Sequence, residues 1–448
     1  MRIELTDNNI GQPNAGVYQR KDVAALFPIA DKTIAELCKE NENLLIFPYS
    51  IESTDDRIGD ASVMTILNTK DPEKVRISTG NVMGFIGVGN LKIKIQSRFD
   101  EGRDDFLLHY MLQRVLSFNL FDLNHNNEQE DVFDFVMFMF PYFLKAAMRQ
   151  GIYREYQNYR HNDANLKGIV DIGRHVARNI PFVGDFAYST REYSFDNNMT
   201  ELIRHTIEFM KTKKYGQAVL NIDRETKENV EAIIEHTPLY DRNERSGIIN
   251  KNLRFRMHPY YTEYRPLQTL CLQILRMEEV KYGESDDIIC GILFDGAWLW
   301  EEYVNTVLDG QGFVHGENKL HKNGIYLFEG HSGVRYPDFY KEDFVLDAKY
   351  KKLGSYVKVS EAGRDDVHQV MAYMTTLKAK RGGFVAPLMQ RQQKVPTAQL
   401  KDSISTLSIF GIEISKTSMS YSDFCERMKE MERVFIESLE LNKKEEDA

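Results

Sequence analysis

The sequence has no long apolar run, and this absence argues against a membrane protein. A helix needs roughly 18 consecutive apolar residues to cross a bilayer. The longest candidate, residues 132–148, is interrupted by Asp134, Pro141 and Lys145. The first residues also lack the apolar core of a secretory signal peptide. We therefore expect a cytoplasmic protein that has no membrane partner.

Cysteine and positive charge are scarce as well. The chain has four cysteines in 448 residues, and they lie far apart in the sequence. This spacing is not typical of a zinc or iron–sulfur site, and it fits a reducing compartment. The 57 Lys and Arg residues are outnumbered by 67 Asp and Glu residues, so the formal net charge is −10. Because a protein that wraps DNA by itself is usually basic, any DNA contact must be a local patch, or a partner must supply much of the binding.

A phosphate-binding glycine loop is missing too. Several glycines lie between residues 80 and 89, but no Gly-Lys-Ser/Thr follows them. The next stretch, residues 91–96, alternates apolar and polar side chains. Alternation predicts a half-buried strand, not the helix that a phosphate loop requires. The glycines therefore favour turns in a small β-barrel or sandwich.

Length and pattern predict a multidomain α+β protein. We expect a β-rich domain over residues 1–102, a mainly helical middle region over 103–285, and an α/β domain with a closing helix over 286–448. In the middle region, residues 151–161 interleave tyrosines with arginines. Such a segment can stack on nucleic acid and neutralise it. It can also be a helix whose tyrosines border the core and whose arginines are solvated.

Two carboxylates and a lysine converge in the C-terminal region. Residues 336–350 read as two strands joined by a polar turn at 340–343. Because side chains alternate along a strand, Asp347 and Lys349 share one face. Asp338, on the other side of the hairpin, is expected to lie beside them. Carboxylate oxygens are the ligands that Mg²⁺ prefers, with Mn²⁺ as a substitute, and the lysine could orient a water that attacks a phosphodiester. The alternative is a solvated hairpin with an ordinary Asp–Lys ion pair.

Two predicted helices flank this hairpin and add polar groups. On the helix before it, Glu301 borders the apolar face and is expected to be a third metal ligand or to form a salt bridge with an arginine or lysine. On the helix after it, Gln369 and Tyr373 are four residues apart, so they lie on one face. That pair could contact the DNA backbone or support Lys349. His368 could act as a general base, or it is an ordinary surface histidine.

These residues carry a family resemblance. Asp338, the triplet Asp347-Ala348-Lys349, the upstream Glu301 and the pair Gln369-x-x-x-Tyr373 resemble the PD-(D/E)xK nuclease superfamily, in the branch of RecB-type nuclease domains. The wider chain resembles the McrC family, the nuclease subunits of McrBC modification-dependent restriction systems. The further stretches that carry this resemblance are residues 91–99, 151–156, 166–168, 195–198 and 299–304. It covers most of residues 80–390 and is looser before them.

The resemblance implies a subunit, not a free-standing enzyme. McrC-like proteins work with McrB, an AAA+ GTPase that assembles into rings, recognises modified double-stranded DNA and translocates it. The N-terminal domain, residues 1–102 here, would dock on the ring and stimulate GTP hydrolysis, while the PD-(D/E)xK domain, residues 286–448, would cut DNA with Mg²⁺. This sequence has no nucleotide-binding motif, so the motor would be another chain. The acidic net charge agrees with DNA binding that is shared with a partner.

Two other functions stay open at this level. The chain could be a regulatory adaptor that activates a motor ATPase without cutting DNA, although both carboxylates and the lysine are present. It could also be a stand-alone RecB- or Cas4-like DNA exonuclease, although the Cas4 branch usually carries clustered cysteines and this chain does not. The leading hypothesis is a Mg²⁺-dependent endonuclease subunit. Its candidate catalytic residues are Asp338, Asp347, Lys349, Glu301, Gln369 and Tyr373, and its candidate metal ligands are Asp338, Asp347 and Glu301.

Overall fold

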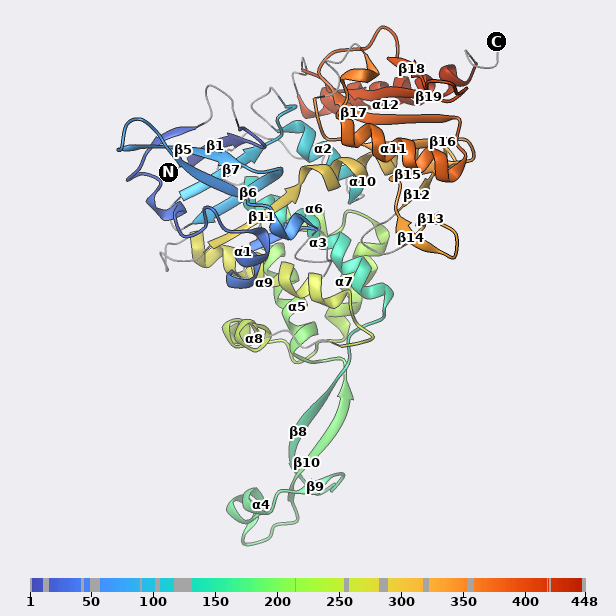
Figure 1. The fold of residues 1–448 in the computed structure, drawn as a ribbon. Coiled ribbons are helices and arrows are strands. Elements are labelled where there is room, and N and C mark those ends of the chain that lie inside the picture. Colours follow the sequence, from blue (N-terminus) through green and yellow to red (C-terminus); the bar gives the residue numbers. More distant parts are fainter. Residues whose placement is uncertain are drawn as a thin grey trace. The chain divides into compact units, whose positions relative to one another are not determined.

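The chain forms two compact units in a computed structural model (Figure 1). Unit 1 combines Met1–Leu123 with Ser285–Ala448, and unit 2 is Asn124–Glu284. The structure describes residues 2–10, 16–41, 44–48, 57–88, 91–100, 105–116, 131–213, 215–253, 258–281, 289–316, 322–352, 358–416, 418 and 420–444. Both predicted domain boundaries, at 102/103 and 285/286, lie outside the described residues, so the three-domain division stays a prediction.

A five-stranded sheet forms the N-terminal part of unit 1. Its order is β1-β7-β6-β11-β3. The strands span Arg2–Thr6 (β1), Leu91–Gln96 (β7), Val82–Val88 (β6), Ile289–Asp295 (β11) and Leu44–Phe47 (β3). Strand β11 follows unit 2 in the sequence, yet it pairs antiparallel with β6 and parallel with β3. The pattern at this strand suggested the start of the C-terminal domain, but its hydrogen bonds place it inside the N-terminal sheet.

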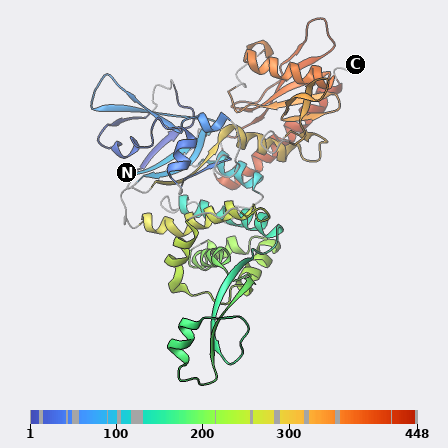
Figure 2. The same cartoon turned by 60° about the horizontal axis from the view of Figure 1, so that its bottom comes forward.

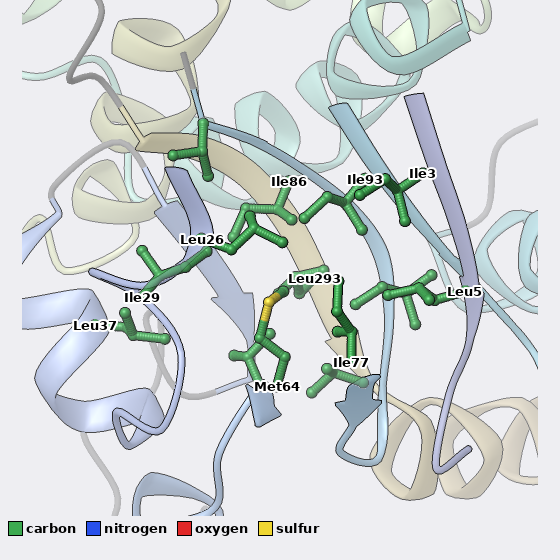
Figure 3. Packing of buried hydrophobic residues seen from close by; sticks show 14 of the residues in the cluster. Ile3, Leu5, Leu26, Ile29, Leu37, Met64, Ile77, Ile86, Ile93 and Leu293 are labelled. Atoms are coloured by element: carbon green, nitrogen blue, oxygen red, sulfur yellow. The ribbon is translucent and has the colours of Figure 1, made fainter. Parts of the chain in front are cut away.

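A second sheet shares an apolar cluster with the first. Its order is β2-β5-β4. Its strands span Val17–Gln19 (β2), Lys74–Thr79 (β5) and Met64–Asn68 (β4), and helix α1 spans Ile34–Glu40. Figure 3 shows side chains from both sheets in this cluster, among them Ile3, Ile93 and Leu293 of the first sheet and Met64 and Ile77 of the second. All five are nearly inaccessible to solvent, so the cluster is a hydrophobic core shared by the two sheets.

A six-stranded sheet forms the C-terminal part of unit 1. Its order is β12-β15-β16-β17-β19-β18. The strands span Val314–His315 (β12), Phe339–Lys341 (β15), Phe344–Ala348 (β16), Arg381–Leu388 (β17), Thr406–Glu413 (β19) and Thr397–Gln399 (β18). Strands β15 and β16 form an antiparallel hairpin, whereas β16, β17 and β19 run parallel. A separate two-stranded hairpin consists of β13 (Ile325–Phe328) and β14 (Ser332–Arg335).

Among the described residues of unit 1, four further α-helices are present. They span Phe106–Val115 (α2), Gly296–Leu308 (α10), Arg364–Leu377 (α11) and Tyr421–Lys444 (α12). Helix α11 makes the crossover that parallel pairing of β16 and β17 requires. Helix α10 begins where the side chain of Asp295 accepts hydrogen bonds from the backbone N–H groups of Ala297 (2.6 Å) and Trp298 (3.0 Å). This cap ends β11 and starts the helix that carries Glu301.

Unit 2 consists of helices and a long hairpin. The helices span Asp131–Arg149 (α3), Asn198–Lys211 (α5), Gly216–Leu220 (α6), Arg224–Glu235 (α7), Arg245–Asn252 (α8) and Tyr264–Lys281 (α9). The hairpin, which we call the finger, spans residues 155–194 and contains β8 (Glu155–Asp163), β9 (Ile169–Val170), α4 (Ile172–Asn179) and β10 (Phe186–Ser194). Figures 1 and 2 show it projecting from the helices of its unit.

The finger corrects one reading of the sequence. A helix was one of two readings for residues 151–161, but most of this segment is strand β8, in antiparallel register with β10. Along β8 the burial alternates residue by residue, which is the period of a strand. Gly84 and Gly87, expected in turns, lie inside strand β6 instead. Residues 91–96 form the predicted strand, β7, and the mixed α+β fold is confirmed. Among the described residues, no helix has the length and apolar character to cross a membrane.

Candidate active site

The predicted hairpin is present, with a tighter turn. Strand β15 extends to Lys341, so Glu342 and Asp343 alone connect the strands, where the sequence suggested a turn over 340–343. Just before β15, Oδ2 of Asp338 accepts a hydrogen bond of 2.7 Å from the backbone N–H of Ala348. This bond joins the Pro-Asp segment to the end of β16. It therefore holds the Asp338 carboxylate beside the residues that follow Asp347.

Asp347 and Lys349 lie on the same face, as the alternation predicts. Lys349 Nζ is 2.6 Å from Asp347 Oδ2, and the Asp347 side chain is 1% exposed. Oδ1 of Asp347 is buried and has no hydrogen-bond partner among the described residues. A buried carboxylate oxygen without a partner is costly, so this atom has capacity for a further ligand.

Helix α11 brings its predicted pair to the lysine. Lys349 Nζ donates to Oε1 of Gln369 (3.2 Å), and Nε2 of Gln369 donates to the hydroxyl of Tyr373 (3.0 Å). Of the two roles suggested by the sequence, support of Lys349 is the one that these contacts match. His368, on the same helix, is exposed to solvent.

Helix α10 places Glu301 at the edge of this group. Its Oε1 is 3.0 Å from Nε2 of His315 in β12, and its side chain is 30% exposed. The neighbouring Trp300 is fully buried and donates from Nε1 to the backbone carbonyl of Val385 in β17 (3.0 Å). That bond fixes α10 against the strand next to β16. A histidine is thus one partner of Glu301, where the sequence suggested metal binding or a salt bridge to an arginine or lysine.

The carboxylates are close enough to perturb one another. Burial raises the pKa of Asp338 well above its usual value, and the charges of Asp347 and Glu301 add to the rise. Burial also raises the pKa of Asp347, against the opposing effect of Lys349. For Lys349, burial alone would lower the pKa, but Asp347 and Asp338 outweigh it and raise the pKa above its usual value. Burial therefore disfavours the ionised forms of both aspartates, while Lys349 favours them.

These residues fit a divalent cation. Asp347 supplies a buried oxygen without a partner, and Mg²⁺ takes such hard oxygen ligands. A cation would also offset the burial and the carboxylate repulsion that together raise the pKa of Asp338. Within the described part of the chain, no three His, Cys, Asp or Glu side chains already converge in metal-binding geometry. Glu301 contacts His315 here, so its part as a third metal ligand stays a prediction.

Two polar residues at the site were missed from the sequence. His315 holds Glu301, and its ring stacks on that of Phe339 with centroids 5.1 Å apart. Asp366, in the first turn of α11, lies 3.6 Å from Lys349 Nζ and 2.8 Å from Lys351 Nζ. The pair Asp365-Asp366 was visible ahead of Gln369, but spacing along a helix does not reveal which carboxylate faces the strand. For His315 the sequence carries no comparable signal, because a two-residue strand has no pattern.

Comparison with known proteins identifies the family of the chain. The family described as "McrBC 5-methylcytosine restriction system component" matches residues 77–387. Among solved structures, a chain of the refined half-complex from the tetradecameric assembly of Thermococcus gammatolerans McrB AAA+ hexamers with bound McrC is similar. Its sequence identity is 15% and its TM-score 0.50, and the match covers 96% of this chain and 100% of that one.

A chain of the Thermococcus gammatolerans McrBC complex also matches, with 15% identity, a TM-score of 0.31, and coverage of 69% of this chain and 87% of that one. Among curated proteins, no match is found. At this level of identity, the similarity to solved structures concerns the fold.

Proposed function

The chain belongs to the family of McrBC 5-methylcytosine restriction system components, and on this premise we propose that it is the DNA-cleaving subunit of such a system. It would be a Mg²⁺-dependent endonuclease with a PD-(D/E)xK domain. It would act on modified double-stranded DNA together with a McrB-like AAA+ GTPase ring whose GTP hydrolysis it stimulates. The observation that carries the proposal is the buried Asp347, whose Oδ1 lacks a partner while its Oδ2 contacts Lys349.

The residues have distinct parts in this proposal. Asp338, Asp347 and Glu301 would hold Mg²⁺, which when bound supplies Lewis-acid activation of a phosphodiester. Lys349, kept charged by the aspartates, would hold the attacking water and offset charge that develops on the phosphate. Gln369 accepts from Lys349 and would keep its ammonium aimed at the water.

The partner-binding surface is a separate part of the proposal. We assign ring docking to residues 1–102, as the family resemblance implies. The finger offers a second candidate surface, because the segment between β8 and β10 exposes large apolar side chains. They are Leu166, Ile169, Ile172, Val176, Ile180, Phe182 and Val183, each at least 46% exposed. Apolar patches of this kind commonly mark protein interfaces.

The test is Asp347→Ala in the complex of the full chain with its AAA+ GTPase. Loss of a metal ligand removes several kcal/mol of transition-state stabilisation, so we expect cleavage of methylated plasmid to fall by about 100-fold or more. Folding and stimulated GTP hydrolysis should be retained. Asp365→Ala is the matched control, because Asp365 is an exposed carboxylate nearby, with its side chain 87% exposed. Full cleavage by Asp347→Ala would contradict the proposal.

The same assay separates the alternatives. A regulatory adaptor would stimulate GTP hydrolysis, yet the wild-type complex would not nick DNA in Mg²⁺ or Mn²⁺. A stand-alone exonuclease would degrade DNA ends as the isolated chain, without nucleotide. Under our proposal, cleavage requires both subunits and GTP.

A further inference from the structure

Tyr350, which follows Lys349, is held by residues from the far end of the sequence. Its hydroxyl lies 2.6 Å from Oγ of Ser97 and donates to Sδ of Met83 (3.2 Å). Ser97 comes directly after β7, and Met83 belongs to β6. The Tyr350 side chain is 3% exposed. The N-terminal sheet therefore packs against the residue next to the candidate catalytic lysine.

Arg98 contacts both the backbone and the ring of Tyr350. Its Nη2 donates to the backbone carbonyl of Tyr350, and its guanidinium lies over the Tyr350 ring, 4.5 Å from the centroid. Phe99 adds an edge-to-face contact with the same ring at 4.9 Å. The carbonyl contact acts on the main chain itself, so it can set the position of the peptide that follows Tyr350.

Asp7, at the end of β1, orients Arg98. Oδ2 of Asp7 is 3.0 Å from Nη1 of Arg98, and Oδ1 accepts a hydrogen bond of 2.5 Å from the Arg98 backbone N–H. The two side chains are 0% and 8% exposed, respectively. Burial raises the pKa of Asp7 to about 6, against the effect of Arg98. Desolvation of two buried charges can cost more free energy than their attraction supplies, so a buried ion pair is weak evidence for stability. A role of Asp7 in positioning Arg98 is therefore worth testing.

The end of β16 is thus held from two sides. On one side, the backbone N–H of Lys349 donates to the carbonyl of Val385 (2.8 Å). On the other, Tyr350 is packed by Arg98 and by Gly296, where an added Cβ would lie 2.7 Å from the Tyr350 ring. Because the Cα atoms of Tyr350 and Lys349 stay about 3.8 Å apart, the position of Tyr350 restricts the position of Lys349.

We propose that Arg98, oriented by Asp7, is a positioning residue that sets the place of Lys349 through Tyr350. The N-terminal sheet then contributes to cleavage without touching the substrate. This inference rests on the proposed nuclease function. A displacement of about 1 Å can cost on the order of 100-fold in rate. Loss of the Arg98 contacts with Tyr350 should therefore lower the rate of the chemical step and leave DNA binding intact.

The test compares Arg98→Lys and the double variant Asp7→Asn/Arg98→Met with wild type, as full chains in complex with the AAA+ partner. The double variant replaces the buried pair by uncharged groups of similar size, so it should fold even if a lone Asp7 charge would not be tolerated. We expect single-turnover cleavage at saturating DNA and Mg²⁺ to fall by about 10- to 100-fold. The KM for DNA and the stimulated GTP hydrolysis should stay within about twofold. Arg98→Lys should retain more activity than the double variant.

A second perturbation and a matched control complete the design. Gly296→Ala pushes on Tyr350 from the other side, while Arg98 stays in place, and it should also slow cleavage. Arg224→Ala removes an exposed ion pair with Glu228 in α7 of unit 2 and should leave cleavage unchanged.

Hydrogen exchange provides a readout that does not depend on cleavage. In the Arg98 variants, the amides of Ala348 and Lys349 should exchange faster, while those of α12 keep their protection. A purely structural role would lower protection throughout unit 1. Wild-type cleavage rates together with unchanged exchange at Ala348 and Lys349 would overturn the inference. A wild-type complex that cannot cut DNA would instead overturn the proposed function, and the exchange result would still decide whether Arg98 positions the strand.

Discussion

The candidate active site and the finger depart in opposite ways from the usual pattern of buried apolar and exposed charged side chains. At the site, charged groups are buried, with the Asp347 side chain 1% exposed. On the finger, apolar groups are exposed, with Ile169 at 81% and Val183 at 75%. A buried charge costs free energy unless it is paired, and exposed apolar side chains forgo the gain from burial. Under the proposed function, the first region would hold a cation and the second would contact a macromolecular surface.

The active site and the finger should also respond differently to substitution. At the site, a change of one functional group should alter chemistry by orders of magnitude. On the finger, a comparable change should leave the folded chain almost unaffected, because few neighbours lose contacts. Three predictions test this contrast.

The largest effect is expected for Asp338→Asn. Asparagine keeps an oxygen that can accept from Ala348 but removes the charge, so DNA cleavage should fall by about 100-fold or more. The metal-free protein should nevertheless become more stable near neutral pH. Because burial raises the folded-state pKa of Asp338, ionisation destabilises the fold as pH rises above the ordinary value of about 3.9.

Thermal unfolding in EDTA at several pH values measures this effect. The stability gain of Asp338→Asn over wild type should be greatest at pH 7 to 8 and should shrink as pH is lowered toward about 4. A variant less stable than wild type at neutral pH would mean that the ionised carboxylate is stabilised by its surroundings. That result would weaken the contrast drawn above.

An intermediate effect is expected for Gln369→Leu. Leucine removes the oxygen that accepts from Lys349, so the lysine loses one orienting contact and the cleavage rate should fall by about 10- to 100-fold. Single-turnover cleavage at saturating DNA measures it. His368→Ala is the control on the same helix, since His368 is exposed. A large loss for His368→Ala with none for Gln369→Leu would favour the general-base role for His368 instead.

The smallest effect is expected on the finger. Ile172 is 74% exposed, so Ile172→Ala should change the free energy of unfolding by less than about 0.5 kcal/mol. The matched control is Ile203→Ala in α5 of the same unit, where the side chain is 0% exposed and the loss should be about 2 to 5 kcal/mol. Chemical denaturation measures both. A large loss at Ile172 would show that the finger packs against other residues in solution, and the contrast would fail.

Much of the fold could be predicted because its pattern is local. Residues 91–96 alternate and form β7, and the helix that carries Gln369 and Tyr373 shows the expected spacing. The finger was harder, because tyrosine and arginine occur readily in either a strand or a helix edge. Its strand β8 is stabilised by pairing with β10, about 30 residues away in the sequence, and such pairing leaves no signal in the segment itself.

The sequence by itself determined the hairpin and the face shared by Asp347 and Lys349, because the alternation of a strand is a property of the backbone. It also indicated Asp338, Glu301, Gln369 and Tyr373 as neighbours of that face. Only the tertiary structure decided that His315 holds Glu301, that β11 completes the N-terminal sheet, and that Arg98 reaches Tyr350. These contacts join segments up to some 250 residues apart. Burial and hydrogen bonding select them during folding, and no local periodicity records them.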